Sequence, residues 1–542
     1  MNTGAVAYLL APLPHLLFYT VQASSRVNGC SHTKTVKHTL TIATFTLVAG
    51  IAAATLLAAA SPAPRHSSTP PVAKASNADS ARAALTDAVA RANEIQDPIQ
   101  KSATLDKIVE IQIKAADLSA AQQTASAIPD SDRRAHAYAA VAYARAASGD
   151  PNSAYALADE VTHGEATGLK LALAPEQQRT YRNAVLKAVA SAQASRGDIA
   201  GVHATMAKAS ISPAGANDFL RLLGKAQVKS GDAGAAEKSF TDYLRSMPDA
   251  GVTADINTQA LALVCAAQLE AGDIAGAQAT AERVHNGATE ATLLAQIASA
   301  EAVPSPGNDA QGIAASASAA PAGAKNVAKA LDLADSYRDL SGFDKSNALL
   351  RIAAAQSSLS DFRGALQTAS KITDGFAKNQ ALTLIAVAQA KAGDVSGAQQ
   401  TANSIVNDAS AKNREDALAE VSIALAYAGD IPSAEKVENL LPMDYDVSAV
   451  TSELAIAQAQ AGDAKTALLT IDRLSEHDRR AWRFRIAAVY GIAKAQGRTG
   501  DATGTRAWIT ALGSQELEAS ALTGLAEGLV EGPVKKIATA RR

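Results

Sequence analysis

Apolar residues recur at helical spacing along most of the chain, and each apolar run ends at a small residue followed by Asp. Eight residues before that small residue stands a Val, Ile or Leu, and the position after it is small. Another apolar residue often lies three residues further back, so the apolar side chains share one helical face. These branched or Leu positions are Val141, Val189, Leu223, Val264, Ile352, Ile385, Val421, Leu454 and Ile492. The pattern predicts an all-α protein.

Nine pairs of a small residue and Asp mark the ends of these runs, and their positions define an internal repeat. The pairs are Gly149-Asp150, Gly197-Asp198, Gly231-Asp232, Gly272-Asp273, Ser360-Asp361, Gly393-Asp394, Gly429-Asp430, Gly462-Asp463 and Gly500-Asp501, and Ala116-Asp117 opens the array. Successive small residues lie 33 to 48 apart, except for one spacing of 88. The small residue is expected to end one helix in the left-handed conformation. The Asp is expected to cap the next helix.

The unit ALTLIAVAQAKAGDVSGAQQTANSI, from Ala381 to Ile405, shows the repeat most plainly. It resembles the tetratricopeptide repeat (TPR) family, which has a helix–turn–helix unit of this length, although the family's aromatic positions are mostly Ala, Gln or Leu here. The resemblance implies a right-handed superhelical solenoid of about ten repeats in residues 81–302 and 326–530. Each unit would bury its apolar face against its neighbours and so form a single spiral rod. The concave surface would be lined by the first helices.

Two segments interrupt or follow the array. Residues 303–325, VPSPGNDAQGIAASASAAPAGAK, are a low-complexity run that accounts for the spacing of 88, and we expect them to form a loop inserted in a repeat. Residues 531–542 form a short basic tail that we expect to fray.

The N-terminal part predicts export. Thr39 to Ala60 is an uncharged stretch of 22 residues, with Lys34 and Lys37 before it and an Ala58-x-Ala60 ending. Residues 36–60 therefore form either a cleaved signal peptide or a retained membrane anchor. Both alternatives place the remainder in the periplasm or another extracytoplasmic compartment. Residues 61–80 are expected to be a disordered Pro/Ser-rich linker, and residues 1–35 a leader that precedes the true start.

Composition argues against several function classes. Aromatic residues are only 4% of the chain and the formal net charge is −3, so nucleic acid is not an expected partner. The two cysteines, Cys30 and Cys265, form no metal-binding cluster, and we expect no metal or cofactor. No catalytic motif is present, so we do not expect an enzyme.

Two sets of polar residues are candidates for a functional role. A Gln stands four residues before the turn in most units, and we expect it to bond to turn carbonyls or neighbouring glutamines, the alternative being a ladder that faces a ligand. These glutamines are Gln112, Gln193, Gln227, Gln268, Gln356, Gln389, Gln458 and Gln496. The family's inward positions map onto six candidate partner-binding residues, whose alternative is an ordinary solvated helix face. They are Tyr143, Lys187, Arg221, Lys225, Tyr490 and Lys494.

The sequence therefore predicts an exported, non-enzymatic scaffold that binds protein or peptide partners through its concave helix surface. The alternative function is a cell-envelope enzyme or a glycan-binding protein built on a helical scaffold.

Overall fold

The computed structural model describes residues 76–161, 174–209, 216–246, 256–302, 312–336, 342–407, 412–474 and 479–533. The chain divides into two compact units, Met1–Ala73 and Lys74–Arg542, and every described residue belongs to the second. The leader and the predicted signal or anchor segment at residues 36–60 therefore lie outside the described residues. No described helix combines the length and the apolarity needed to cross a membrane.

The described residues form an all-α structure of 24 helices. The helices are α1 (Asn77–Glu94), α2 (Pro98–Lys114), α3 (Leu118–Ser126), α4 (Ser131–Ala147), α5 (Pro151–Glu160), α6 (Pro175–Ser195), α7 (Ile199–Lys208), α8 (Ala216–Lys229), α9 (Ala233–Arg245), α10 (Ile256–Glu270), α11 (Ile274–Ala281), α12 (Gly287–Ala302), α13 (Gly312–Ser336), α14 (Gly342–Ser358), α15 (Phe362–Ser370), α16 (Gly375–Lys391), α17 (Val395–Asn403), α18 (Asn413–Tyr427), α19 (Ile431–Glu438), α20 (Ser448–Gln460), α21 (Ala464–Ile471), α22 (Arg479–Arg498), α23 (Ala502–Ile509) and α24 (Gln515–Glu531).

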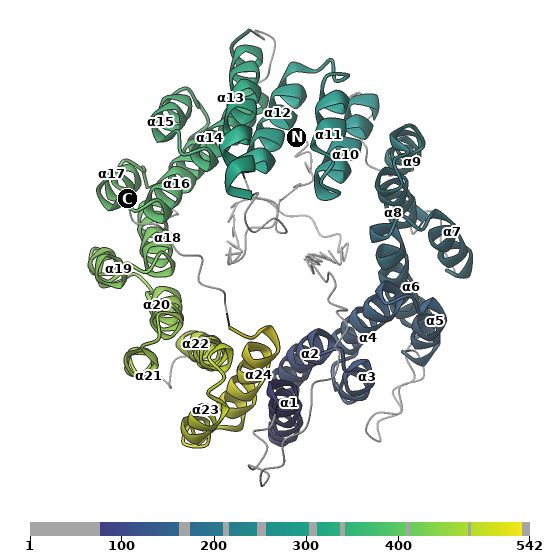
Figure 1. Ribbon diagram of the computed structural model, residues 1–542, viewed down its shortest axis with the longest axis vertical. Coiled ribbons are helices and arrows are strands. Elements are labelled where there is room, and N and C mark those ends of the chain that lie inside the picture. The colour runs from purple at the N-terminus through teal and green to yellow at the C-terminus, as the bar shows by residue number, and fades with distance from the viewer. Residues whose placement is uncertain are drawn as a thin grey trace, which may run out of the picture. The chain divides into compact units, whose positions relative to one another are not determined.

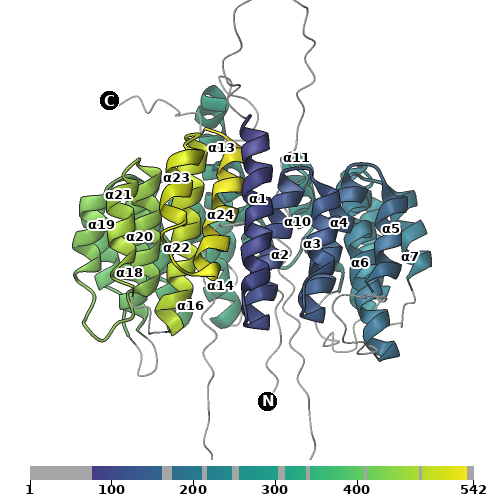
Figure 2. The same ribbon diagram turned by 90° about the horizontal axis from the view of Figure 1, so that it is seen from below.

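From α2 onward the helices alternate between two layers. Each even-numbered helix packs against the next even-numbered one, and each odd-numbered helix covers the helix before it. Figure 1 shows α4, α6, α16, α18 and α20 on the inside, with α5, α7, α17, α19 and α21 outside them. Seen from the side, the helices lie side by side with their axes roughly parallel (Figure 2). We call the even-numbered helices the inner layer.

The turn between the two helices of a unit has the predicted geometry. The eight turn glycines have φ between 73° and 98°, and Ala116 and Ser360 adopt the same left-handed region at 58° and 62°. All ten turn aspartates accept a hydrogen bond from the backbone N–H three residues later, at 2.8–3.2 Å. Since this N–H has no partner within the helix, the Asp supplies one. Both expectations are confirmed.

The Gln column is structural, but its partner is not the one expected. In five units the buried Gln side chain accepts a hydrogen bond from a Thr hydroxyl 12 residues later, in the second helix, at 2.6–2.8 Å. The pairs are Gln193–Thr205, Gln268–Thr280, Gln356–Thr368, Gln389–Thr401 and Gln458–Thr470. The prediction that these glutamines bond to turn carbonyls or to neighbouring glutamines is therefore wrong for these five units. The Thr was overlooked because its separation of 12 residues spans the turn.

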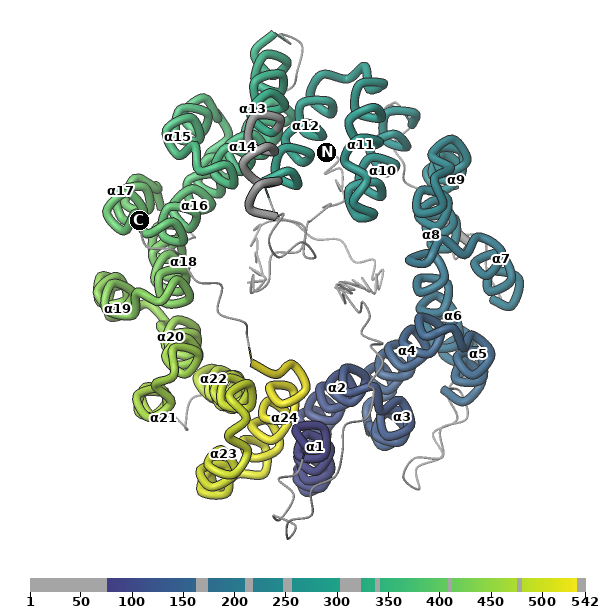
Figure 3. The backbone as a smooth tube through the Cα atoms, viewed as in Figure 1, coloured from purple at the N-terminus to yellow at the C-terminus, as the bar shows by residue number. Residues whose placement is uncertain are grey.

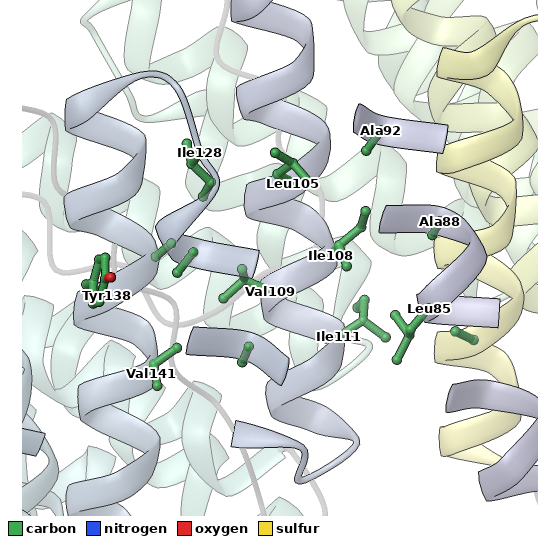
Figure 4. Close-up of a cluster of buried hydrophobic side chains, with 14 of the residues drawn as sticks. Leu85, Ala88, Ala92, Leu105, Ile108, Val109, Ile111, Ile128, Tyr138 and Val141 are labelled. Carbon is green, nitrogen blue, oxygen red and sulfur yellow. The ribbon is translucent and has the colours of Figure 1, made fainter. Parts of the chain in front are cut away.

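The second unit closes on itself, which differs from the expected spiral rod. The first helix, α1, packs against the last, α24, and α24 also contacts α2. One continuous cluster of buried apolar side chains runs from α20 through α24 and α1 to α8. Figure 3 shows the helices following one another around a ring, and Figure 4 shows Leu85, Ala88 and Ala92 of α1 between α24 and α2. The two ends of the array therefore share one core.

α1 occupies, beside α24, the place that the second helix has in the other units. An ordinary second helix such as α3 covers its own first helix and the next one, and α1 covers α24 and α2 in the same way. Its sequence explains the fit, because Ala88, Ala92 and Ile95 have the spacing of Ala365, Ala369 and Ile372 in the α15 unit. All six residues are buried. The repeat that ends the chain is thus completed by the helix that begins the array.

Two predicted boundaries change. The linker expected to reach residue 80 ends earlier, because α1 begins at Asn77 and Ser76 caps it. In the insertion, residues 303–311 lie outside the described residues, whereas residues 312–325 form the first part of α13 rather than a loop. Alanine has the highest helix propensity, and this stretch is rich in it, which accounts for the difference.

Candidate interaction surface: the inner helix layer

The free face of each inner helix follows from the repeat. Residues 11, 8 and 4 positions before the turn face the outer helix, and in α16 these are Leu382, Ile385 and Gln389, all buried. Positions 13, 9, 6 and 2 before the turn lie on the opposite side of the helix, given 100° per residue. We call this stripe the inner face. Its side chains are the ones available to a partner within the ring.

Three of the six predicted residues connect neighbouring inner helices. They are Tyr143 of α4, Lys187 of α6 and Lys225 of α8. Lys187 of α6 forms an ion pair with Asp218 of α8. Lys225 of α8 pairs with Glu270 of α10 at 2.6 Å. The Tyr143 hydroxyl of α4 lies 3.5 Å from the hydroxyl of Ser195 in α6. These contacts link successive repeats, and the half-exposed lysine side chains remain within reach of solvent.

Arg221 differs from these three. It lies half-buried on α8 and forms none of the hydrogen bonds or ion pairs found among the described residues. Together, Lys187, Arg221, Lys225 and the exposed Lys229 form a group that we call the basic arc, on α6 and α8. Three of these four cations belong to the predicted set, and their role in partner binding stays a prediction.

Tyr490 and Lys494 of α22 lie apart from the basic arc, at the closure of the ring. Both bind Glu527 of α24, which is 2% exposed: Lys494 at 3.1 Å, and Tyr490 through its hydroxyl. Lys114 of α2 makes a third contact with the same carboxylate. The ammonium of Lys107, also on α2, lies 5.5 Å from the centre of the Tyr490 ring. These two residues therefore join α22, α24 and α2, and their role in partner binding stays a prediction.

The carboxylate at the closure is strongly stabilised in its charged form. Burial by itself would raise the pKa of Glu527, but hydrogen bonds from Lys114 and Tyr490 and the charge of Lys494 lower it to about 2. A buried charge of this kind is tolerated only when its partners are in place. The network therefore depends on the ring being closed.

A second region of the inner face was absent from the predicted set. Three apolar residues stand six positions before the turn in successive inner helices: Val387 of α16, Ile423 of α18 and Ile456 of α20. Nine positions before the turn the same helices carry Leu384, Glu420 and Glu453, and Asp416 and Tyr427 lie on the same face of α18. We call these eight residues the apolar–acidic arc. The repeat register would have located it in the sequence, but only long cations and aromatic side chains were selected there.

The acidic residues of this arc are unequally satisfied. Glu453 accepts a hydrogen bond from Tyr427 at 2.5 Å, and Asp416 accepts one from Tyr445 at 2.8 Å. Glu420 makes no hydrogen bond or ion pair among the described residues. Burial and the charge of Asp416 raise the pKa of Glu420 to about 7, and Lys391 of α16 opposes that rise. Near neutral pH this carboxyl group is therefore only partly ionised.

Metal sites and reactive thiols have characteristic geometries, with which the described residues can be compared. Among the described residues, no group of three or more His, Cys, Asp or Glu side chains is placed to hold a metal ion. Burial raises the pKa of the Cys265 thiol to about 12, which keeps it protonated and unreactive.

Comparisons with known proteins do not identify the chain. No protein family matches it, and no curated protein matches it. Among solved structures, Ton1535 from Thermococcus onnurineus NA1 aligns over 63% of this chain and 96% of its own, with 19% identity and a TM-score of 0.24. A superposition this distant carries no argument about fold or function.

Proposed function

We propose that the chain is an exported, non-enzymatic scaffold, built as a TPR-like α-solenoid, that binds protein or peptide partners through the inner face of its first helices. The observation that carries the proposal is the regular inner layer, in which the same helical positions recur from repeat to repeat and form one extended surface. Repeat proteins commonly bind partners through such surfaces, by many contacts distributed over several units.

Other features support the same conclusion. The turn aspartates are engaged as helix caps and the paired glutamines hold helix to helix, so these two recurring polar columns serve the scaffold. Side chains six positions before the turn, on the inner face, vary from unit to unit, as Tyr143, Lys225 and Val387 show, and such variation provides specificity. Export is supported by the uncharged stretch from Thr39 to Ala60 behind a basic segment.

Site-specific photo-crosslinking of the full-length chain in its own cells tests the proposal. A photo-reactive phenylalanine analogue would replace Tyr143 or Tyr427 on the inner layer, and Leu469, which is 62% exposed on outer helix α21, is the matched control position. We expect light-dependent protein adducts at the two inner positions and none at Leu469. Adducts at Leu469 alone would contradict binding through the inner face. Turnover of cell-wall fragments by the purified chain would contradict a non-enzymatic role.

A further inference from the structure

We propose that the apolar–acidic arc on α16, α18 and α20 is a docking site for a cationic amphipathic helix of a partner protein. The inference rests on the proposed function and deepens it, because it names the chemistry of the partner and the part of the inner face that binds it.

The apolar side chains of the arc form a row across three helices. Val387, Ile423 and Ile456 occupy the same position in successive repeats, and all three are half-buried. Neighbouring helix axes lie about 8–10 Å apart, so these side chains recur at about that interval. Residues seven apart on one face of an α-helix recur at about 10.5 Å. A helix lying across the three inner helices can therefore place one apolar side chain against each of them.

The remainder of the inner face does not offer such a row. At the equivalent position, six residues before the turn, α2, α4, α6 and α8 carry Glu110, Tyr143, Ser191 and Lys225. Contiguous apolar residues on a face open to partners mark an interaction site, whereas isolated ones do not. The row is thus a local property of the arc and not a general property of the repeat.

Charge identifies the kind of helix that fits. Asp416, Glu420 and Glu453 all lie on this face, and the charge of Lys391 on α16 acts on Glu420. Lys391 forms no ion pair among the described residues, and Glu420 accepts no hydrogen bond among them. A Lys or Arg beside the apolar side chains of the partner would provide Glu420 with the counter-charge that it lacks. An acidic helix would instead place like charges together, which opposes binding.

This arrangement makes binding depend on pH. Asp416 lies one helical turn before Glu420, Lys391 faces it from α16, and Glu453 occupies the same row on α20. Because a bound cation favours the ionised carboxylate, and the pKa of Glu420 is about 7 in the unbound protein, affinity should increase as pH rises from 6 to 8.

The test uses two labelled peptides on the immobilised full-length chain. One is an amphipathic helix of Leu and Lys with Leu at seven-residue intervals, and the other has Glu in place of every Lys. We expect the Leu/Lys peptide to bind at least about tenfold more tightly than the Leu/Glu peptide, and more tightly at pH 8 than at pH 6. Equal binding of the two peptides would overturn the proposal.

Variants separate docking at the arc from general attraction of a cationic peptide. Glu420→Gln should weaken binding of the Leu/Lys peptide about tenfold and remove its pH dependence, and Ile423→Ala should weaken it about fivefold. Glu282→Gln, which removes an exposed carboxylate at the end of outer helix α11 and outside the arc, is the matched control and should change affinity less than about twofold. Equal losses in Glu420→Gln and Glu282→Gln would overturn the proposal, and the helical circular dichroism of both variants is compared with that of the parent chain.

The inference and the proposed function fail separately. Crosslinks at Tyr143 and Tyr427 without any preference for the Leu/Lys peptide would retain the scaffold and reject the docking site. The absence of partner adducts at both inner positions would reject the scaffold itself.

Discussion

The closing unit, α24 with α1, and an ordinary unit, α16 with α17, place two helices in the same relation by different chemistry. In the ordinary unit a three-residue connection joins the helices, with Gly393 left-handed, Asp394 capping α17, and Gln389 bonded to Thr401. In the closing unit the two helices come from opposite ends of the described array, and no turn connects them. There the apolar packing of α1 against α24 and the ion pair between Arg91 and Glu518 at 2.9 Å hold the two helices together, and the buried carboxylate of Glu527 ties α24 to α2.

The difference shows how each unit is specified. In the ordinary unit the partners are 5 to 12 residues apart in sequence, so local chemistry is sufficient. In the closing unit Lys114 and Glu527 are 413 residues apart, and they meet only when every intervening repeat has stacked. Errors in the stacking angle accumulate around a ring. The closing contacts therefore form only when the geometry of the whole array is correct. Substitutions that remove them should lower the free energy of unfolding more than equivalent substitutions within an ordinary unit.

The largest effect is expected for Gly528→Ala. A Cβ at Gly528 would lie 2.1 Å from the backbone carbonyl oxygen of Lys494, so α22 and α24 would have to separate. We expect a loss of about 3 kcal/mol, typical of overpacking a rigid contact, measured by thermal unfolding followed by circular dichroism. Gly375→Ala is the control, because its Cβ would meet no atom within 4 Å. Similar melting of both variants would show that the close approach does not stabilise the packing of α24 against α22.

The next effect is expected for Glu527→Gln, which leaves Lys114 and Lys494 without their shared carboxylate. Both lysines remain partly exposed, so we expect a loss of about 2 kcal/mol, below the roughly 3–5 kcal/mol of a fully buried pair, and hydrogen exchange should show that α1 and α24 open first. Glu282→Gln, an exposed carboxylate at the end of α11, is the control. Unchanged exchange in α1 and α24 would contradict a role for this charge in holding the ring closed.

The same carboxylate predicts a dependence of stability on pH. The pKa of Glu527 is about 2 in the folded chain against an ordinary value of 4.5, so its contribution is complete above pH 4.5 and is lost as pH falls toward 2. We expect the melting temperature of the parent chain to fall more steeply over this interval than that of Glu527→Gln. Parallel profiles would show that another group controls acid unfolding of the closure.

An intermediate effect is expected in the ordinary unit. Gln389→Leu leaves the hydroxyl of Thr401 buried without its acceptor, at a cost of about 1–3 kcal/mol. The double variant Gln389→Leu/Thr401→Val should recover most of that loss, because α18 and α19 already pair Leu425 with Val437 at the same positions. A double-mutant cycle measures the coupling. Additive losses in the two single variants would contradict a specific Gln–Thr bond.

The smallest effect is expected for Arg506→Ala, which removes a half-exposed ion pair between α23 and Asp87 of α1. Such pairs contribute about 0.2–1 kcal/mol and weaken with salt. The difference in melting temperature between the variant and the parent chain should therefore nearly vanish in 1 M NaCl. A difference that persists at high salt would mean that packing, rather than charge, is what Arg506 provides.

The repeat could be predicted because its determinants are close in sequence. Gly393 and Asp394 are adjacent, and Ala398 follows within one turn of the second helix, so a single sequence reveals the turn, the cap and the close crossing. The prediction was weaker for the candidate site. Selecting long cations and aromatics gave Lys187, Arg221 and Lys225 of the basic arc together with Tyr490 and Lys494, which bind Glu527. It passed over Glu420, because the environment of a carboxyl group depends on three neighbouring helices.

The sequence by itself determined the all-α class, the helix pairs, their turns and caps, and the face that each first helix buries, because these depend on contacts within about one repeat. Only the tertiary structure decided that the array closes, since closure depends on the small rotation between units summed over the whole chain. The accumulated rotation also places α1 beside α24, in the position of a second helix. The spacing of Ala88, Ala92 and Ile95 suits α1 to that position, but the sequence alone did not show that α24 would be its neighbour. The same rotation buries Glu527 between α2 and α22.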